Sequence, residues 1–287
     1  MANAAGAHAV SELAGRPRRF PLPLNKMGST MPVKAGPARE VLMPQRHLRE
    51  ATADAARQTA PSGLGMDSAQ VRQRMVQRLQ ADGLRDERVL HALAQVLRHR
   101  FVDSALATQA YEDTSLPIGH GQTISKPSVV GRMLALLLDG AAAAETGSLG
   151  RVLEIGTGCG YQAAVLALLA RHVVSIERLK LLHEKACANL ARERQNHIRL
   201  IYGDGRLGHA PAAPFDSIVA AAGGDDLPQS WLDQLAPGGR LVAPMTSPCG
   251  RGQVLIVVDH RVTAGVGRFV RSAHEAVLFV PLKSGVM

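Results

Sequence analysis

The chain has 287 residues, of which 46% are hydrophobic, a share that suits a soluble protein with a buried core. Its apolar runs are far shorter than the roughly 18 residues that a membrane helix needs, so we expect no membrane association. The net charge is +9, but residues 1–65 hold nine Lys/Arg against four Asp/Glu. Most of the excess therefore lies in one short segment, and we expect no specific nucleic-acid partner.

The cysteines also exclude some classes of protein. Cys159, Cys187 and Cys249 are an odd number without C-x-x-C spacing. They predict neither a disulfide framework nor a zinc site, and they suit a reducing compartment. The N-terminus has no continuous apolar segment after a basic start, which a secretory signal needs. We therefore expect a cytoplasmic protein without a bound metal.

Residues 1–62 are rich in Ala, Gly, Pro and Arg and show no helical or strand periodicity. This composition predicts a disordered basic extension. Periodicity begins near Asp67, so we expect a single folded domain over residues 63–287. Within this domain, residues 63–145 predict a helical and loop region, and residues 146–287 predict an α/β core.

Two amphipathic helices open the folded part. Ser68–Gln80 has a capping residue at its start and Gly83 just past its end. Asp86–His99 carries its apolar residues on one stripe. Together they predict a helical cap on the core.

The stretch Leu116–Pro127 predicts a loop because it is rich in Gly, Pro and polar residues. Pro127 then fits the first turn of a helix that ends near Asp139, where Gly140 stops it. Ser125 lies near the expected cap of this helix.

From Arg151 onward, short β-branched runs alternate with helical stretches. The predicted strands are Arg151–Ile155, His172–Glu177, Ile198–Tyr202, Ser217–Ala221 and Arg240–Pro244, with helices at Tyr161–Ala170 and Leu179–Arg194. This alternation predicts a parallel sheet that helices cover on both faces.

Three further strand-like runs follow with little room for helices between them: Gln253–Asp259, Gly267–Arg271 and Ala276–Val280. They predict antiparallel strands at one edge of the sheet. The expected fold class is therefore α/β, a doubly wound, mostly parallel sheet with antiparallel strands at one edge and an N-terminal helical cap.

A glycine-rich turn follows the first predicted strand. The run Val152–Tyr161 places Gly156, Thr157, Gly158 and Gly160 between a buried strand and a helix. Glycines here allow a tight bend and let a ligand lie against bare backbone. The G-x-G-x-G spacing is tighter than the G-x-G-x-x-G of dinucleotide sites, and it suits S-adenosylmethionine because this cofactor has no phosphate. For this motif alone, an ordinary strand-to-helix turn is the alternative.

Two acids stand at the ends of the next two predicted strands. Glu177 can accept hydrogen bonds from both ribose hydroxyls of an adenosine, or it can be a solvated loop acid. Asp204, next to Gly205, can accept from the adenine amino group, or it can be a turn residue between glycines. Ligands of open α/β sheets bind outside the carboxyl ends of the strands. The glycine turn and the two acids, in this order, therefore predict an adenosyl site.

A more specific motif precedes the glycine turn, in the run Gln122-Thr-Ile-Ser-Lys-Pro127. Together with Val152–Tyr161, Gly203–Gly205, Leu235–Leu241 and Phe279–Leu282, it resembles the protein-L-isoaspartate O-methyltransferase family over residues 66–283. The resemblance implies a Rossmann-like methyltransferase fold, with S-adenosylmethionine as methyl donor and S-adenosylhomocysteine as product. It implies methylation of the free α-carboxylate of L-isoaspartyl residues in damaged proteins and peptides, which starts their repair through a succinimide.

The resemblance also implies roles for single residues. Ser125 is expected to orient the acceptor carboxylate, with Thr123 in the same acceptor loop, and capping of the next helix is the competing role for Ser125. A carboxylate is already ionised at neutral pH, so the site needs positioning more than a strong base. Glu154 resembles the acid that helps hold the methionine part of the cofactor, or else it orients the glycine turn. Weaker substrate contacts are expected from His120, Gln122, Gln253 and Leu282.

Two departures from the family pattern concern the acceptor side. Gly223 and Gly224 stand where an Ala-rich stretch is usual, which predicts a looser wall of the acceptor pocket. Lys283 stands where some members have Thr. Both departures bear on peptide binding more than on the reaction.

Three alternatives remain open beside a monomeric repair methyltransferase. A nucleic-acid methyltransferase is disfavoured because no Asn/Asp-Pro-Pro-aromatic run follows the fourth strand, and Pro248-Cys249 comes one strand too late for a cytosine-C5 enzyme. A dinucleotide-dependent dehydrogenase is disfavoured by the glycine spacing. A binding module would hold the cofactor without turnover.

Overall fold

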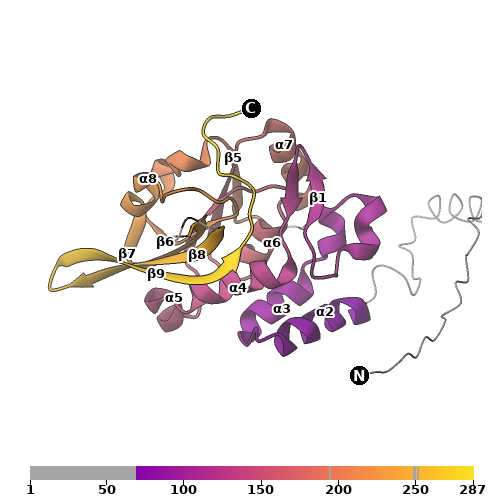
Figure 1. Cartoon of the computed structure of the whole chain (residues 1–287), viewed down its shortest axis with the longest axis horizontal. Coiled ribbons are helices and arrows are strands. Elements are labelled where there is room, and N and C mark those ends of the chain that lie inside the picture. The colour runs from indigo at the N-terminus through magenta and orange to yellow at the C-terminus, as the bar shows by residue number, and fades with distance from the viewer. Residues whose placement is uncertain (1–68, 194, 248–249, 251) are drawn as a thin grey trace, which may run out of the picture. The chain divides into compact units, whose positions relative to one another are not determined.

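A computed structural model describes residues 69–193, 195–247, 250 and 252–287 (Figure 1). The predicted extension at residues 1–62 lies outside the described residues, as do Pro248 and Cys249. No helix in the described part is both long and apolar enough to cross a bilayer.

A sheet of seven strands in the order β5-β4-β3-β6-β7-β8-β9 forms the centre of the described part. Its strands are β3 (Arg151–Ile155), β4 (His172–Glu177), β5 (Ile198–Tyr202), β6 (Phe215–Ala220), β7 (Leu235–Thr246), β8 (Gln253–Thr263) and β9 (Val266–Val277). β3 to β7 pair in parallel, and β8 and β9 are antiparallel additions at one edge. The predicted fold class is confirmed.

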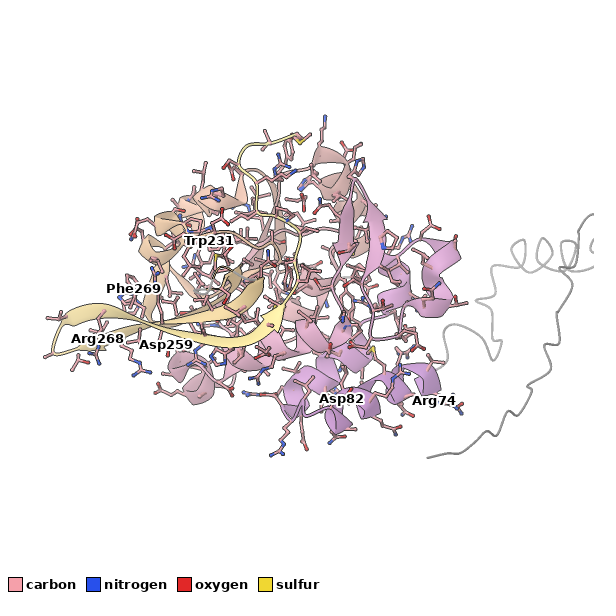
Figure 2. All side chains as sticks on the ribbon, in the orientation of Figure 1. Arg74, Asp82, Trp231, Asp259, Arg268 and Phe269 are labelled. Carbon is pink, nitrogen blue, oxygen red and sulfur yellow. The ribbon has the colours of Figure 1, made fainter. Side chains whose placement is uncertain are left out.

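Successive side chains of the strands point to opposite faces of the sheet and build two cores. Val152 and Val173 belong to a core with residues of α4, α6 and α7, whereas their neighbours Leu153 and Val174 pack in a second core with Trp231 of α8. Figure 2 shows Trp231 among the side chains of this second core. These helices are α4 (Pro127–Leu138), α6 (Tyr161–Ala167), α7 (Lys180–Leu190) and α8 (Gln229–Asp233). Both faces are therefore covered, as the alternation of strands and helices predicts.

The N-terminal helices are α2 (Ala69–Ala81) and α3 (Glu87–Gln95). The Asp86 side chain caps α3 by accepting hydrogen bonds from the first turn. α3 ends four residues before the predicted His99, because Val96 is extended and a short 3-10 helix, Arg98–Phe101, follows it. Tertiary contacts decide this end, since both Arg98 and Phe101 turn into the protein interior. The structure also adds a short helix that the sequence did not predict, α5 (Ala141–Thr146).

The predicted loop at Leu116–Pro127 contains a small antiparallel hairpin instead, formed by β1 (Leu116–Gly119) and β2 (Gln122–Ile124). Its two turn residues, His120 and Gly121, have φ of 53° and 66°. Positive φ at both central residues is typical of the tight turns that hairpins prefer. The loop prediction was therefore wrong for these strands. Strands of four and three residues are too short to show a clear alternation of apolar and polar residues in the sequence.

The start of α4 also differs from the prediction. Lys126 is its N-cap residue, and no side chain of the cap bonds to the helix. Instead, Asp113 accepts hydrogen bonds from the Ser128 backbone N–H (2.8 Å) and hydroxyl (2.7 Å). The competing role of Ser125 as the cap is therefore wrong, whereas Pro127 occupies the first turn as predicted.

The edge of the sheet has fewer and longer strands than predicted. Gly267–Arg271 and Ala276–Val280 were expected as separate strands, but β9 runs unbroken from Val266 to Val277 along β8. Most β9 side chains are exposed, so polar residues are tolerated there and the apolar pattern is lost although backbone pairing continues. Figure 2 shows the tip of this hairpin, with Arg268 and Phe269, away from the core.

Candidate active site

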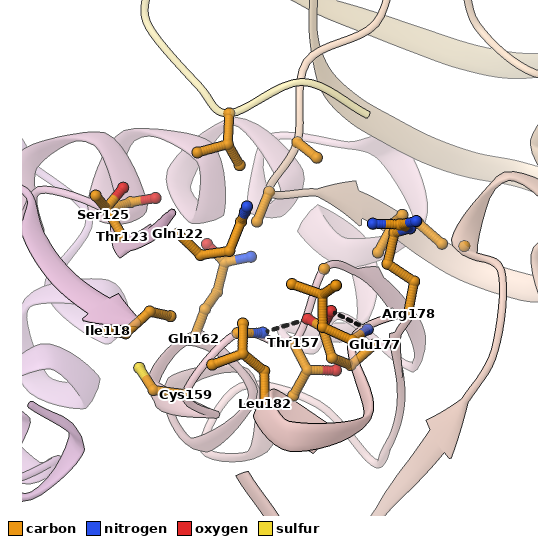
Figure 3. A pocket seen from close by; sticks show the side chains of 18 of the residues that line it. Ile118, Gln122, Thr123, Ser125, Thr157, Cys159, Gln162, Glu177, Arg178 and Leu182 are labelled. Atoms are coloured by element: carbon orange, nitrogen blue, oxygen red, sulfur yellow. Dashed lines mark hydrogen bonds between the residues drawn. The ribbon is translucent and has the colours of Figure 1, made fainter. Parts of the chain in front are cut away.

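A cavity of about 340 Å³ opens at the carboxyl ends of β3, β4 and β5, next to the β1–β2 hairpin (Figure 3). This volume falls within the range of roughly 300–1,000 Å³ that ligand pockets have. The predicted residues that line it are His120, Gln122, Thr123, Ser125, Gly156, Thr157, Gly158, Glu177, Gly205 and Leu282. The other predicted residues, all of which the structure describes, lie outside this lining: Glu154, Gly160, Asp204 and Gln253. The predicted acceptor loop and the glycine turn thus face one cavity.

The glycine turn needs glycine at its first two positions. Gly156 and Gly158 have φ of 89° and 57°, a region that L side chains rarely adopt. The Gly156 and Thr157 amides both donate to the Ile176 carbonyl of β4. The backbone of the turn is therefore held against the sheet, with bare backbone toward the cavity.

Glu177 ties this turn to the end of β4. Its side chain is buried, with one carboxylate oxygen accepting from the Gly158 amide and the other from the Leu179 amide, each at 2.9 Å. Figure 3 shows both bonds at the cavity wall. Each carboxylate oxygen has a second lone pair, so Glu177 can still accept from two hydroxyl groups of a ligand.

Glu154 lies beneath the turn, in a buried chain of side chains. Ser175 donates to Glu154 Oε2 at 2.5 Å, and the Thr157 hydroxyl lies 2.6 Å from the Ser175 hydroxyl. Glu154 is fully buried, and this burial, with a smaller contribution from the charge of Glu177, raises its pKa to about 8. Thr157 lines the cavity, whereas Glu154 does not. Glu154 is therefore connected to the site through the hydrogen bonds of Ser175 and Thr157.

The raised pKa of Glu154 makes stability depend on pH. Between about pH 4.5 and 8 the unfolded chain releases a proton that the folded chain keeps, so stability falls as the pH rises, by at most about 1.4 kcal/mol per pH unit. We expect wild type to lose about 2 kcal/mol relative to Glu154→Gln between about pH 5.5 and 7.5. Urea unfolding of both proteins at the two pH values measures this difference. Equal losses in both proteins would contradict a proton held at Glu154.

Asp204 follows β5 by two residues and makes bonds outside the cavity. One carboxylate oxygen accepts from the Arg206 amide (2.9 Å) and the other from the Gly285 amide (2.6 Å). Arg178 reaches the same tail by donating from Nε to the Gly285 carbonyl (2.8 Å), and the Met287 amide donates to the Arg178 carbonyl. The C-terminal tail thus joins the cavity wall, and the adenine role of Asp204 stays a prediction.

Sequence reasoning missed several residues of the site. Arg178 and Met287 line the cavity, and no sequence pattern pointed to them, whereas Lys283, predicted to bear on peptide binding, lines it as well. The indole of Trp231, buried on the far face of the sheet, donates to the Gly205 carbonyl (2.8 Å) and holds the loop after β5. Gln162, directly after the glycine turn, also lines the cavity. Both of its amide atoms are buried, and the amide lies close enough to Glu154 to lower the pKa of that carboxyl against the larger effect of burial.

Gly223 and Gly224 follow two residues that line the cavity, Ala221 and Ala222. Gly223 bonds through its backbone to Val280 and Leu282, and Gly224 bonds to Pro244 and Thr246. Both glycines therefore join the closing segment 280–282 to β7. The looser wall that this departure predicts stays a prediction.

Gly223 should tolerate no side chain. A Cβ there would overlap the Gln253 amide group, whose oxygen accepts from the Phe279 amide at 2.7 Å. We expect Gly223→Ala to destabilise the fold by about 1–3 kcal/mol, through overpacking or the loss of that bond. The matched control is Gly224→Ala, whose Cβ would have 3.4 Å or more to its nearest neighbours and should cost less than about 1 kcal/mol. Denaturant unfolding measures both, and equal losses would contradict the argument.

Comparisons with known proteins identify the family. The model of the protein-L-isoaspartate(D-aspartate) O-methyltransferase family matches residues 69–287. A protein-L-isoaspartate O-methyltransferase from Methylibium petroleiphilum is 60% identical over 267 residues, which cover 93% of this chain and 96% of the relative. One from Leptothrix cholodnii is 58% identical over 272 residues, covering 93% and 94%.

Solved structures give the same result. A protein-L-isoaspartate O-methyltransferase superposes with a TM-score of 0.65 at 25% identity, covering 75% of this chain and 67% of that one. The two sequence matches cover most of each chain, and the structural match shows the same fold over 75% of this chain. The chain therefore belongs to the protein-L-isoaspartate(D-aspartate) O-methyltransferase family.

Proposed function

We propose that this chain transfers a methyl group from S-adenosylmethionine to the free α-carboxylate of L-isoaspartyl residues in proteins and peptides, and that Ser125 positions this carboxylate. Membership of the family supports the reaction and the substrate class. One observation carries the residue assignment: the Ser125 side chain and the turn anchored by Glu177 line the same cavity.

The chain's own residues fit the cofactor. Glu177 offers buried carboxylate lone pairs for the ribose hydroxyls, and the backbone of Gly156 and Gly158 offers a surface without side chains. The buried amide of Gln162 provides both a donor and an acceptor at the cavity wall. The methionine part of S-adenosylmethionine carries an ammonium and a carboxylate, so it needs both a hydrogen-bond acceptor and a donor from the protein. When bound, S-adenosylmethionine supplies an electrophilic methyl group on its sulfonium.

On the acceptor side, the proposed task is positioning. An isoaspartyl carboxylate is ionised near neutral pH and needs no base to become a nucleophile. The hydroxyls of Ser125 and Thr123 can donate to it without neutralising its charge, and His120 and Gln122 lie in the same hairpin. Holding the nucleophile in line, about 3 Å from the carbon under attack, accounts for the main part of catalysis in such a site.

The proposal includes the extent of the working unit. We propose that residues 63–287 suffice for the reaction as a monomer in the cytoplasm, without a specific nucleic-acid or membrane partner. Deletion of residues 1–62 is expected to leave kcat and KM for an isoaspartyl peptide within about two-fold of the full chain. A large loss of kcat on deletion would show that the extension contributes to the site.

The deciding experiment compares two peptides that differ only in one residue, L-isoaspartate or normal L-aspartate. Full-length protein and labelled cofactor are incubated with each, and base-labile label is counted. Label on the isoaspartyl peptide alone is the expected result. Cofactor binding without label on either peptide would reject the proposed substrate and return the acceptor question to nucleic acids and small molecules.

A further inference from the structure

Arg98 is buried between the acceptor hairpin and the cofactor helix. Its side chain has no solvent exposure, and it lies in the 3-10 helix that replaces the predicted end of α3. The guanidinium donates to the Ala110 carbonyl (2.8 Å) and the Ser125 carbonyl (2.7 Å), with a longer contact to the Thr114 carbonyl (3.5 Å). These carbonyls belong to chain segments on either side of β1 and β2.

The flat side of the same guanidinium lies over Tyr161, with 4.7 Å between Arg98 Cζ and the ring centroid. Tyr161 is the first residue of α6 and follows the glycine turn directly. One side chain therefore contacts both halves of the site: the backbone of Ser125, whose side chain lines the cavity, and the helix that starts at the cofactor turn.

Burying the charged side chain of Arg98 costs free energy. Within the described part of the chain, no carboxylate forms an ion pair with Arg98, and burial lowers its pKa. Packing alone would favour an apolar side chain at this position. What arginine adds is a planar fork that can donate to several carbonyls at once while it stacks on an aromatic ring.

Ser125 has no other anchor of this kind in the described structure. It does not cap α4, and the bonds that hold the start of α4 run from Asp113 to Ser128, three residues further on. The Arg98 bond to the Ser125 carbonyl acts on the residue itself. A shift of this carbonyl would move the Ser125 side chain relative to the glycine turn.

We propose that Arg98 is a positioning residue of the methyl-transfer site, which fixes Ser125 against the cofactor helix by holding the Ser125 carbonyl and stacking on Tyr161. This inference rests on the proposed function of Ser125. Arg98 touches neither the acceptor nor the cofactor, so its loss acts on the chemical step through Ser125. Because Arg98 does not line the cavity and makes no bond to Glu177 or the glycine turn, we expect cofactor affinity to stay unchanged.

The test uses full-length Arg98→Met and Arg98→Lys. Methionine fills space without donors, and lysine keeps the charge but not the fork. For both we expect kcat with an isoaspartyl peptide to fall about 10-fold or more, with Kd for S-adenosylhomocysteine within about two-fold of wild type. Val89→Ala, a buried change in α3 outside the cavity lining, controls for lost stability and should keep kcat. If Arg98→Met does not fold, Arg98→Lys carries the test.

Amide hydrogen exchange gives a readout independent of turnover. Faster exchange in residues 122–126 of the Arg98 variants, with β4 unchanged, is expected. Wild-type kcat in both variants, a parallel loss of kcat and cofactor affinity, or unchanged exchange in residues 122–126 would overturn the proposal. If wild type itself does not methylate the isoaspartyl peptide, the proposed function fails, and the exchange measurement still decides whether Arg98 holds the hairpin.

Discussion

Replacing Ser125 by alanine is expected to lower kcat/KM for an isoaspartyl peptide by about 10- to 150-fold. The variant loses one hydrogen bond to a charged group, which contributes about 1.5–3 kcal/mol, and each 1.36 kcal/mol corresponds to a factor of ten in rate. The Kd for S-adenosylhomocysteine should stay within about two-fold, because the residues proposed to hold the cofactor are untouched. Steady-state kinetics with the isoaspartyl peptide, together with calorimetric titration of S-adenosylhomocysteine, measures both quantities.

Ser128→Ala is the matched control for this change. Ser128 stands three residues further along the same segment, outside the cavity lining. Its hydroxyl bonds to Asp113, and its backbone bond to Asp113 remains in the variant. It should keep kcat/KM within about two-fold. Equal kinetics of Ser125→Ala and wild type would remove Ser125 from the acceptor site.

Glu177→Gln is expected to weaken binding of S-adenosylhomocysteine by about 10- to 150-fold. In wild type both carboxylate oxygens accept from backbone amides, of Gly158 and Leu179. A glutamine has one oxygen and one NH₂ group, so in either orientation a donor faces one of these amides. Leaving a buried donor unsatisfied destabilises the turn by about 1–3 kcal/mol in the free and the bound protein alike, whereas losing a charged acceptor for the ribose weakens binding by about 1.5–3 kcal/mol. Isothermal titration measures the change in Kd.

The same substitution at an exposed position controls for the lost charge. Glu184 lies on the solvent side of α7, so Glu184→Gln changes the net charge equally without touching the cavity. Its Kd for S-adenosylhomocysteine should match wild type. A Glu177→Gln protein that binds within about three-fold of wild type would mean that Glu177 serves only the fold of the turn.

The central sheet could be predicted from local patterns. β3, β4 and β5 have the predicted bounds. β3 and β4 are continuous apolar runs because they are buried on both faces, whereas β5 is a half-exposed edge strand. The glycine turn could also be predicted from the sequence, since left-handed backbone angles favour glycine at positions 156 and 158. Order along the chain then placed Glu177 at the same edge of the sheet, because parallel strands end together.

Residue types and their spacing thus determined the fold class, the edge of the sheet that carries the site and the glycine turn and acceptor residues that line its cavity. Only the tertiary structure decided where the remaining polar groups point. Asp204 bonds to the amide of Gly285, 81 residues away, and Arg98 to the carbonyl of Ser125, 27 residues away. Glu154 has a raised pKa because surrounding elements exclude water from it. Such contacts join segments whose separation leaves no local periodicity, so they arise only when the chain packs.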